Sequence, residues 1–269
     1  MEQDKLKSYF NVNRELWNGW TEFHKGSSTY DIEGFKQGRS SLHRIEVKEL
    51  GDVAGKKILH LQCHFGLDTL SWVRRGGSVT GIDFSDRAIK LARSLAKELD
   101  LNARFICSNI YDLKEKLDEK FDIVFTSYGI LAWLPDLKKW ADTIYHFLHT
   151  GGIFYIVEFH PILNMFNDDG DLQNSYFHRE QPLEYECKGS YAAPQADFIH
   201  KAFEWDHPLS EVISSLTQAG LAINFLHEFP YTISGDFPFL IQGEDGLWRF
   251  KGLENKIPLM FSIKTSKQD

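Results

Sequence analysis

The stretch KKILHLQCHFGLDTLSW, Lys56–Trp72, decides how the rest of the chain is interpreted. Its first part is short and apolar, as in a buried parallel strand, and its last part has helical spacing. A strand, a tight turn and a helix form the opening unit of a nucleotide-binding α/β fold. The turn contains Gln62, His64 and Phe65 but a single glycine, Gly66, where such folds usually have a glycine-rich loop. The sequence therefore predicts a ligand-binding turn with unusual side chains.

Outward from this stretch, apolar strands alternate with amphipathic helices. We expect strands at 58–61, 78–82, 104–107, 121–126 and 153–158, and helices at 67–75, from Ser85 onward and at 140–148. A further helix at 210–219 and strands at 222–228 and 258–265 follow. This alternation predicts an α/β fold built on a doubly wound parallel sheet.

The two flanking regions do not follow the alternation. Residues 6–24 have the pattern of a helix, residues 25–41 that of a loop, and residues 41–50 that of a second helix. After the fifth strand the rhythm stops, and we expect an insertion or lid at about 161–206. The predicted organisation is a helical cover at 1–50 and a cofactor domain with that insertion at 51–269.

Composition limits the classes of partner. A net charge of −8 argues against a broad nucleic-acid surface, which needs clustered lysines and arginines. No run approaches the ~18 apolar residues that span a bilayer, so no membrane partner is expected. Three scattered cysteines (Cys63, Cys107 and Cys187) without C-x-x-C spacing fit a reducing, cytoplasmic location. The oligomeric state stays open between monomer and homodimer.

An acidic residue ends the second expected strand. Asp83 stands in GIDFS, 21 positions beyond Gln62, close to the ~20-residue spacing of a carboxylate that holds both hydroxyls of a ribose. A carboxylate suits this task because it accepts two hydrogen bonds at once. The alternative is a turn residue before Ser85, and the strand context favours the ribose function.

Four stretches together carry a family resemblance. ILHLQCHFG aligns without a gap with the motif V-L-D-L-G-C-G-T-G, and VTGIDFSDRAIKLAR, ARFICSNIYDL and FDIVFTSYGILAWLPDLKKW follow in the expected order. The chain thereby resembles a class I S-adenosylmethionine-dependent methyltransferase, in a bacterial small-molecule subgroup with an LHLQCHFG variant of the first motif. The resemblance implies a Rossmann-like seven-stranded mixed sheet with an antiparallel C-terminal hairpin strand, and leaves residues 161–204 outside.

The resemblance also implies a cofactor site for S-adenosylmethionine, with S-adenosylhomocysteine as the product. Asp83 would take the ribose hydroxyls and Phe84 would lie against the adenine. Asn109 and the backbone N–H of Ile110 would face the adenine edge, and Ser127 would border the methionine end. The first turn would contribute the remaining cofactor contacts, through Gln62, His64 and Gly66.

Two departures from the family motif lie in the first turn. His60 stands where an acidic residue usually steers the amino group of the methionine, and a neutral histidine is a weaker partner for that ammonium. Gln62 and His64 replace glycines, which matters if those positions need a positive φ or a close backbone approach. Gly66 keeps the position nearest the start of the helix.

The reactive edge offers three candidates for a proton acceptor. Tyr128 follows the fourth strand, and Glu158 and His160 end the fifth. Tyr128 could instead be a polar wall, and His160 a solvated residue before Pro161. No metal is expected, because His60 and His64 lie on a strand and turn rather than on a helix face and no HExxH motif occurs.

The predicted function is methyl transfer to an oxygen, nitrogen or carbon of an unidentified small organic molecule. One alternative is a protein of the same fold that binds S-adenosylmethionine or a related nucleoside without turnover. A less favoured alternative is an NAD-dependent dehydrogenase, against which the missing G-x-G-x-x-G counts. Trp17, Trp20, Tyr30 and Phe35 are expected either in a cover over the acceptor or in plain packing against the sheet.

Overall fold

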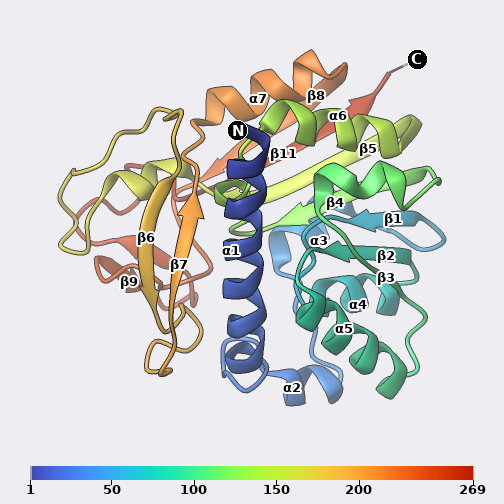
Figure 1. The fold of residues 1–269 in the computed structure, drawn as a ribbon, viewed down its shortest axis with the longest axis horizontal. Helices are drawn as coiled ribbons and strands as arrows, with labels where there is room; N and C mark the ends of the chain where they lie inside the picture. The colour runs from blue at the N-terminus through green and yellow to red at the C-terminus, as the bar shows by residue number, and fades with distance from the viewer. Residues whose placement is uncertain (1, 269) are drawn as a thin grey trace.

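The computed structural model describes residues 2–268 and has a seven-stranded mixed sheet at its centre (Figure 1). The strand order is β3-β2-β1-β4-β5-β11-β8, and β11 alone runs antiparallel to both of its neighbours. The strands are β1 (Lys57–His60), β2 (Ser78–Asp83), β3 (Arg104–Cys107), β4 (Phe121–Ser127), β5 (Leu148–Phe159), β8 (Leu221–Phe229) and β11 (Met260–Lys267). The expected doubly wound sheet with an antiparallel C-terminal strand is confirmed.

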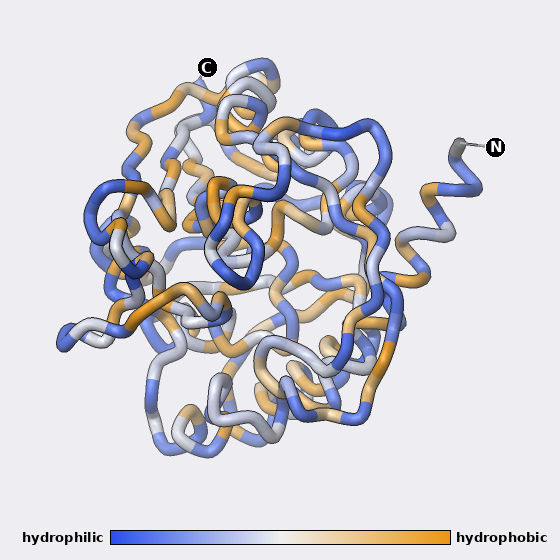
Figure 2. Tube along the Cα trace, turned by 90° about the vertical axis from the view of Figure 1, so that its left-hand side faces the viewer, coloured by the Kyte–Doolittle hydropathy of each residue, from blue (hydrophilic) through white to orange (hydrophobic). Residues whose placement is uncertain are grey.

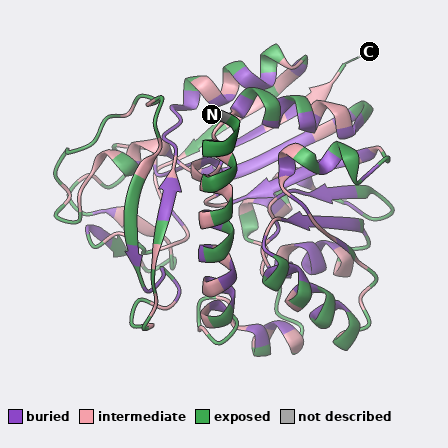
Figure 3. Cartoon of the chain, in the orientation of Figure 1, coloured by how far each residue is buried: buried purple, intermediate pink, exposed green. Residues whose placement is uncertain are grey.

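Helices cover both faces of this sheet because successive strand residues point to opposite sides. Leu59 and Val124 face α6 and α7, whereas Ile58 and Ile123 face α3 and α4. The helices are α3 (Arg44–Leu50), α4 (Leu67–Arg74), α5 (Asp86–Glu98), α6 (Leu137–Phe147) and α7 (Leu209–Gln218), with short 3-10 turns at Ile110–Glu115, Leu131–Trp133 and Pro161–Met165. Figure 3 shows the result: the central strands are buried, whereas the helices around them alternate between buried and exposed residues.

A long N-terminal helix, α1 (Glu2–His24), stands between this body and a smaller antiparallel pair (Figure 1). The pair consists of β6 (Leu183–Lys188) and β7 (Ile199–Glu204). The side-chain amide of Asn13 donates to the carbonyl oxygen of Phe203 at 2.7 Å and accepts from its N–H at 2.9 Å. Leu16 and Trp20 pack against Cys187 and Ala202, so α1 is fixed to the hairpin by polar and apolar contacts.

The regions outside the sheet differ from the sequence-based expectation in three places. Residues 25–41 contain a short helix, α2 (Ile32–Lys36), and the next helix begins at Arg44 rather than at 41. The insertion, which shows no strand pattern in the sequence, contains the β6–β7 hairpin. A second small pair, β9 (Leu240–Gln242) and β10 (Trp248–Phe250), lies between the last two expected strands, where no strand was expected. Short strands of this kind depend on tertiary packing, which local patterns do not report.

The distribution of hydropathy follows the layers. Apolar residues run mostly through the interior of the trace, and the first turns of α1 project from the body (Figure 2). Among residues 2–268, no helix combines the length and the apolar character needed to cross a membrane.

Candidate functional site

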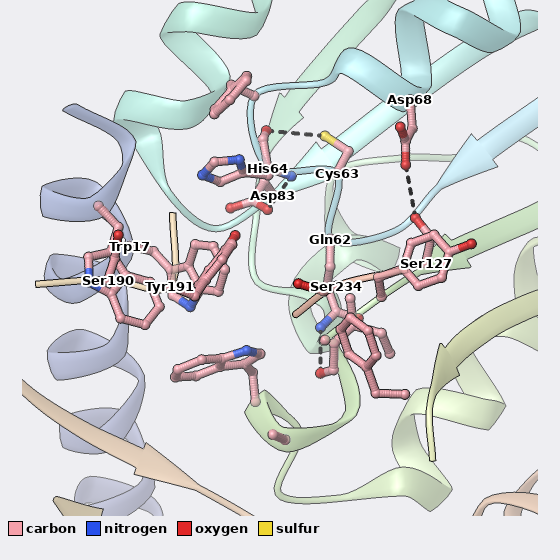
Figure 4. Close-up of a pocket in the computed structure, with 18 of the residues that line it drawn as sticks. Trp17, Gln62, Cys63, His64, Asp68, Asp83, Ser127, Ser190, Tyr191 and Ser234 are labelled. Carbon is pink, nitrogen blue, oxygen red and sulfur yellow. Dashed lines mark hydrogen bonds between the residues drawn. The ribbon is translucent and has the colours of Figure 1, made fainter. Parts of the chain in front are cut away.

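A cavity of about 730 Å³ opens where the carboxyl ends of β1, β2 and β4 meet α1 and the β6–β7 hairpin (Figure 4). Ligands of open α/β sheets bind at this edge. Nine of the eleven predicted site residues line the cavity: Gln62, His64, Gly66, Asp83, Phe84, Asn109, Ile110, Ser127 and Tyr128. Segments far apart in the sequence therefore meet here as the β–α order predicts.

The first turn has left-handed backbone at every second residue. The φ angles are 54° at Gln62, 50° at His64 and 79° at Gly66. A non-glycine residue in this region costs roughly 1–2 kcal/mol. Local hydrogen bonds offset this cost, since Gln62 Nε2 donates to the carbonyl oxygen of Ile130 at 3.1 Å and the N–H of His64 donates to Asp83 Oδ2 at 2.8 Å. The two positions that replace glycines thus need positive φ and adopt it with side chains present.

Gly66 has a steric requirement as well. A Cβ atom added at this residue would lie 2.6 and 2.7 Å from two ring carbons of Phe105 and 3.2 Å from Cβ of Ala92. The loop therefore turns directly onto α5 and β3, and only glycine fits there.

Asp83 is buried at the end of β2, with 7% of its surface exposed. Its Oδ1 accepts from the N–H of Ser85 at 2.8 Å, and its Oδ2 accepts from the N–H of His64. Burial raises the pKa of this carboxyl to about 6. A carboxylate has about four acceptor sites, so two remain for a ligand.

The part of the cavity that is predicted to hold the adenine is less open than the sequence suggests. Asn109 caps a 3-10 turn, and its Oδ1 accepts from the N–H of Tyr111 at 3.1 Å. Only the second lone pair of this oxygen is left for an adenine amino group. Phe84 and Ile110 line the same part of the cavity.

On the far side of the first turn, Asp68 is a cavity residue that the sequence reasoning missed. It lies in the first turn of α4, and its Oδ1 and Oδ2 accept from the hydroxyls of Ser41 at 2.6 Å and Ser127 at 3.1 Å. The sequence could have indicated Asp68 through its place, an acidic residue two positions after Gly66.

His60 is buried and bonded through Nδ1 to the hydroxyl of Thr69 at 2.8 Å. Burial lowers its pKa to about 4.

The three predicted proton acceptors have different surroundings. Tyr128 lines the cavity, its hydroxyl donates to Glu46 Oε2 at 2.9 Å, and burial raises its pKa well above the ordinary range. Its phenol therefore stays protonated, which favours a polar wall over a base. Neither Glu158 nor His160 is among the described residues that line the cavity.

Glu158 has the contacts of an anchor for the turn after β4. Its carboxylate accepts from the N–H groups of Gly129 at 2.5 Å and Ile130 at 2.7 Å. His160 contacts Glu228 Oε1 through Nε2 at 3.0 Å and accepts from the N–H of Ile162 at 3.2 Å. Their proton-accepting function remains a prediction.

The wall of the cavity next to the first turn is aromatic. Trp17 lies 5.3 Å from His64 and 5.3 Å from Trp133, measured between ring centroids. Trp20, Tyr30, Tyr185 and Tyr191 are among the other aromatic residues that line the cavity. Phe35 packs instead into the apolar cluster around α5, so three of the four expected cover aromatics line the cavity.

Several buried polar atoms face this region without a hydrogen-bond partner among residues 2–268. They are Nε1 of Trp17, Oε1 of Gln62 and both ring nitrogens of His64. Buried polar groups usually have partners, so these atoms mark a place where a bound ligand could supply the missing hydrogen bonds.

The insertion contributes one carboxylate to the cavity. Glu204, on β7, accepts from the hydroxyl of Tyr185 at 2.5 Å, and burial raises its pKa to about 7.

His207 lies outside the cavity lining. Its Nε2 contacts the carbonyl oxygen of Leu134 at 2.6 Å, and its Nδ1 contacts Glu211 at 3.0 Å. With His178, these residues bring three possible ligand atoms within 4.8 Å of one another, but both ring nitrogens of His207 already have partners, Glu211 and the carbonyl oxygen of Leu134.

Comparison with known proteins agrees with this geometry. Residues 58–152 match the family of methyltransferase domains. The chain is 29% identical over 133 residues to a ubiquinone biosynthesis O-methyltransferase of Photorhabdus laumondii, covering 47% of this chain and 54% of the relative. It is 32% identical over 171 residues to a demethylmenaquinone methyltransferase of Lactococcus lactis, covering 60% and 65%.

Among solved structures, an S-adenosylmethionine-dependent methyltransferase from Clostridium acetobutylicum superposes with a TM-score of 0.57 at 13% identity, covering 84% of this chain and 89% of that one. This likeness concerns the fold. The chain spans about half the length of the first curated relatives it matches. Residues 58–152 thus match the methyltransferase domain family, and the strand order is that of the S-adenosylmethionine-dependent methyltransferase fold.

Proposed function

We propose that the protein transfers a methyl group from S-adenosylmethionine to a small organic acceptor. The observation that carries this proposal is one cavity that holds both the residues of the family's cofactor motifs and an aromatic wall. The sulfonium of the cofactor supplies an activated methyl group with a good leaving group, so the protein has mainly to position the reactants and exclude water.

In this proposal Asp83 binds the ribose through the acceptor sites that its backbone contacts leave free. Phe84, Asn109 and Ile110 border the adenine, and Ser127 borders the methionine. The free acceptor of Gln62 and the free nitrogens of His64 fit a polar ligand in the first turn. The hydrogen-bonding groups of the cavity are thus compatible with this cofactor.

The acceptor would lie between the cofactor turn and the aromatic wall formed by α1 and the insertion. We infer that residues 1–50 and about 161–206 serve together as this cover. If the acceptor loses a proton, Glu204 is a better placed carboxylate than Glu158, because it lines the cavity and its pKa is about 7. The names of the curated relatives suggest a quinone-like aromatic acceptor as the first class to screen.

Titration calorimetry with S-adenosylmethionine, S-adenosylhomocysteine and NAD tests the cofactor. We expect both sulfur compounds to bind and NAD to bind far more weakly. The variant Asp83→Ala should lose most of the affinity for S-adenosylhomocysteine, because hydrogen bonds to a charged group contribute about 1.5–3 kcal/mol each. Absence of binding of either sulfur compound at millimolar concentration would refute the proposal, and unchanged affinity of Asp83→Ala would refute the ribose assignment.

The alternative, a protein that binds the cofactor without turnover, is favoured by one observation. Two of the three predicted proton acceptors, Glu158 and His160, lie away from the cavity lining. The two functions differ in a methyl-transfer assay with a panel of phenols, amines and carbon acids, where formation of S-adenosylhomocysteine only in the presence of an acceptor supports catalysis.

A further inference from the structure

The methionine amino group of the cofactor needs an anionic partner that this chain lacks at the usual place. Position 60 holds His60, which lines the cavity but is buried, with 3% of its surface exposed, and is bonded to Thr69. With a pKa lowered to about 4 by burial, this imidazole is neutral at physiological pH. It neither attracts nor repels an ammonium strongly, so the negative charge has to come from elsewhere.

Asp68 is an acid that lines the cavity close to this position. Gly66 ends the left-handed turn and Asp68 follows two residues later, in the first turn of α4, with its carboxyl group toward Ser127 (Figure 4). In the same view, Asp83 and His64 lie on the other side of the turn. One carboxylate thus stands on the ribose side and another on the Ser127 side, which is the predicted methionine side.

The contacts of Asp68 hold the carboxylate without neutralising it. Among the described residues its two hydrogen-bond donors are the neutral hydroxyls of Ser41 and Ser127. Arg39, which also lines the cavity, is paired with Asp31 at 2.9 Å. Two acceptor sites of the Asp68 carboxylate stay free, enough for two N–H donors of an ammonium group.

The charge of Asp68 is felt across this end of the cavity. After burial, which is the largest cause, Asp68 contributes to the raised pKa of Glu46. It contributes to the raised pKa of Tyr128 as a smaller cause, after burial, Glu46 and Tyr155. Burial raises the pKa of Glu46 to about 8, so this neighbour adds little negative charge beside Asp68 at neutral pH. A bound cation would complete the arrangement, since a charge-assisted hydrogen bond is about twice as strong as a neutral one.

We propose that Asp68 replaces the missing acid of the first motif and binds the ammonium group of the cofactor's methionine. The inference rests on the proposed function. Ser41 and Ser127 act as positioning residues that fix the carboxylate. The simpler explanation is an acid that only stabilises the start of α4 through the helix dipole; that explanation predicts an effect on stability but none that depends on the ligand's amino group.

The test compares two ligands that differ in the methionine part. S-Adenosylhomocysteine has the ammonium, whereas 5′-deoxy-5′-methylthioadenosine has the same nucleoside and sulfur but no amino acid. Calorimetry on Asp68→Asn should show about 10- to 100-fold weaker binding of S-adenosylhomocysteine and less than about twofold change for methylthioadenosine. Asp83→Asn should weaken both ligands, because both contain the ribose.

Asp86→Asn is the matched control, since Asp86 is also an acid in the first helical turn after a strand but lies outside the cavity lining. It should leave both affinities unchanged. If Asp68→Asn does not fold, Ser41→Ala removes the 2.6 Å contact and should weaken only S-adenosylhomocysteine, by a few-fold. Equal weakening of both ligands, or of neither, overturns the inference for Asp68; failure of the unmodified protein to bind S-adenosylhomocysteine overturns the proposed function itself.

Discussion

Replacement of Gly66 by alanine tests whether the single glycine of the first turn is structurally required. Gly66 has φ 79°, a conformation that costs an alanine roughly 1–2 kcal/mol. The new methyl group would also lie 2.6 and 2.7 Å from ring carbons of Phe105. Overpacking of a core typically costs about 1–3 kcal/mol. Together these effects should lower the free energy of unfolding by about 2–5 kcal/mol.

Gly55 provides a matched control, because its φ is 73° and an added Cβ would meet nothing within 4 Å. Gly55→Ala should therefore show the backbone cost alone, about 1–2 kcal/mol. Urea unfolding followed by tryptophan fluorescence gives both values. The difference between the variants isolates the steric contribution at Phe105. Equal losses for the two variants would refute the claim that Gly66 is required by close packing.

Two further predictions concern buried polar groups away from the cofactor turn. Burial raises the pKa of Glu46 to about 8, above its value of 4.5 when unfolded, so the folded protein holds a proton that the unfolded chain releases. The free energy of unfolding should thus fall as pH rises from about 4.5 to 8, and this group contributes at most about 1.4 kcal/mol per pH unit. Glu46→Gln should reduce this dependence of the unfolding free energy on pH. The same dependence on pH in the variant and the unmodified protein would contradict the prediction. Asn13→Ala removes both hydrogen bonds to the backbone of Phe203 and should lower the free energy of unfolding by about 2–4 kcal/mol. Proteolytic cleavage within residues 161–206 should also become faster. A cleavage rate equal to that of the unmodified protein would count against the inference that Asn13 fixes the insertion to α1.

The fold was accessible from the sequence because each sheet element has a local signature. The apolar run of β4 and the Ser85 cap of α5 are both visible in the chain, and Ser85 does accept from the N–H of Ala88. The structure of the insertion at about 161–206 was less accessible. Its β6–β7 hairpin is short and depends on contacts with α1 that lie 190 positions away in the chain.

The candidate site, too, has a part that the sequence predicts and a part that it does not. Strand ends predicted which residues line one side of the cavity, because a residue at the carboxyl end of a parallel strand reaches the ligand edge whatever surrounds it. Residues that meet the ligand edge from elsewhere gave no such signal. Glu204 joins the cavity only through the packing of β7, and Glu158 points away from the cavity lining because three backbone N–H groups of the turn after β4 bind its carboxylate.

The sequence by itself determined the order of strands and helices, the acid at the end of β2 and the glycine at the start of α4, since these depend on periodicity and spacing along the chain. Only the tertiary structure decided which side chains face the cavity and with what charge. It made His60 neutral by burial, put Gln62 and His64 in left-handed backbone, and directed the carboxylate of Asp68 toward Ser127. Orientation and ionisation depend on neighbours from distant parts of the chain, and those neighbours meet only when the sheet has formed.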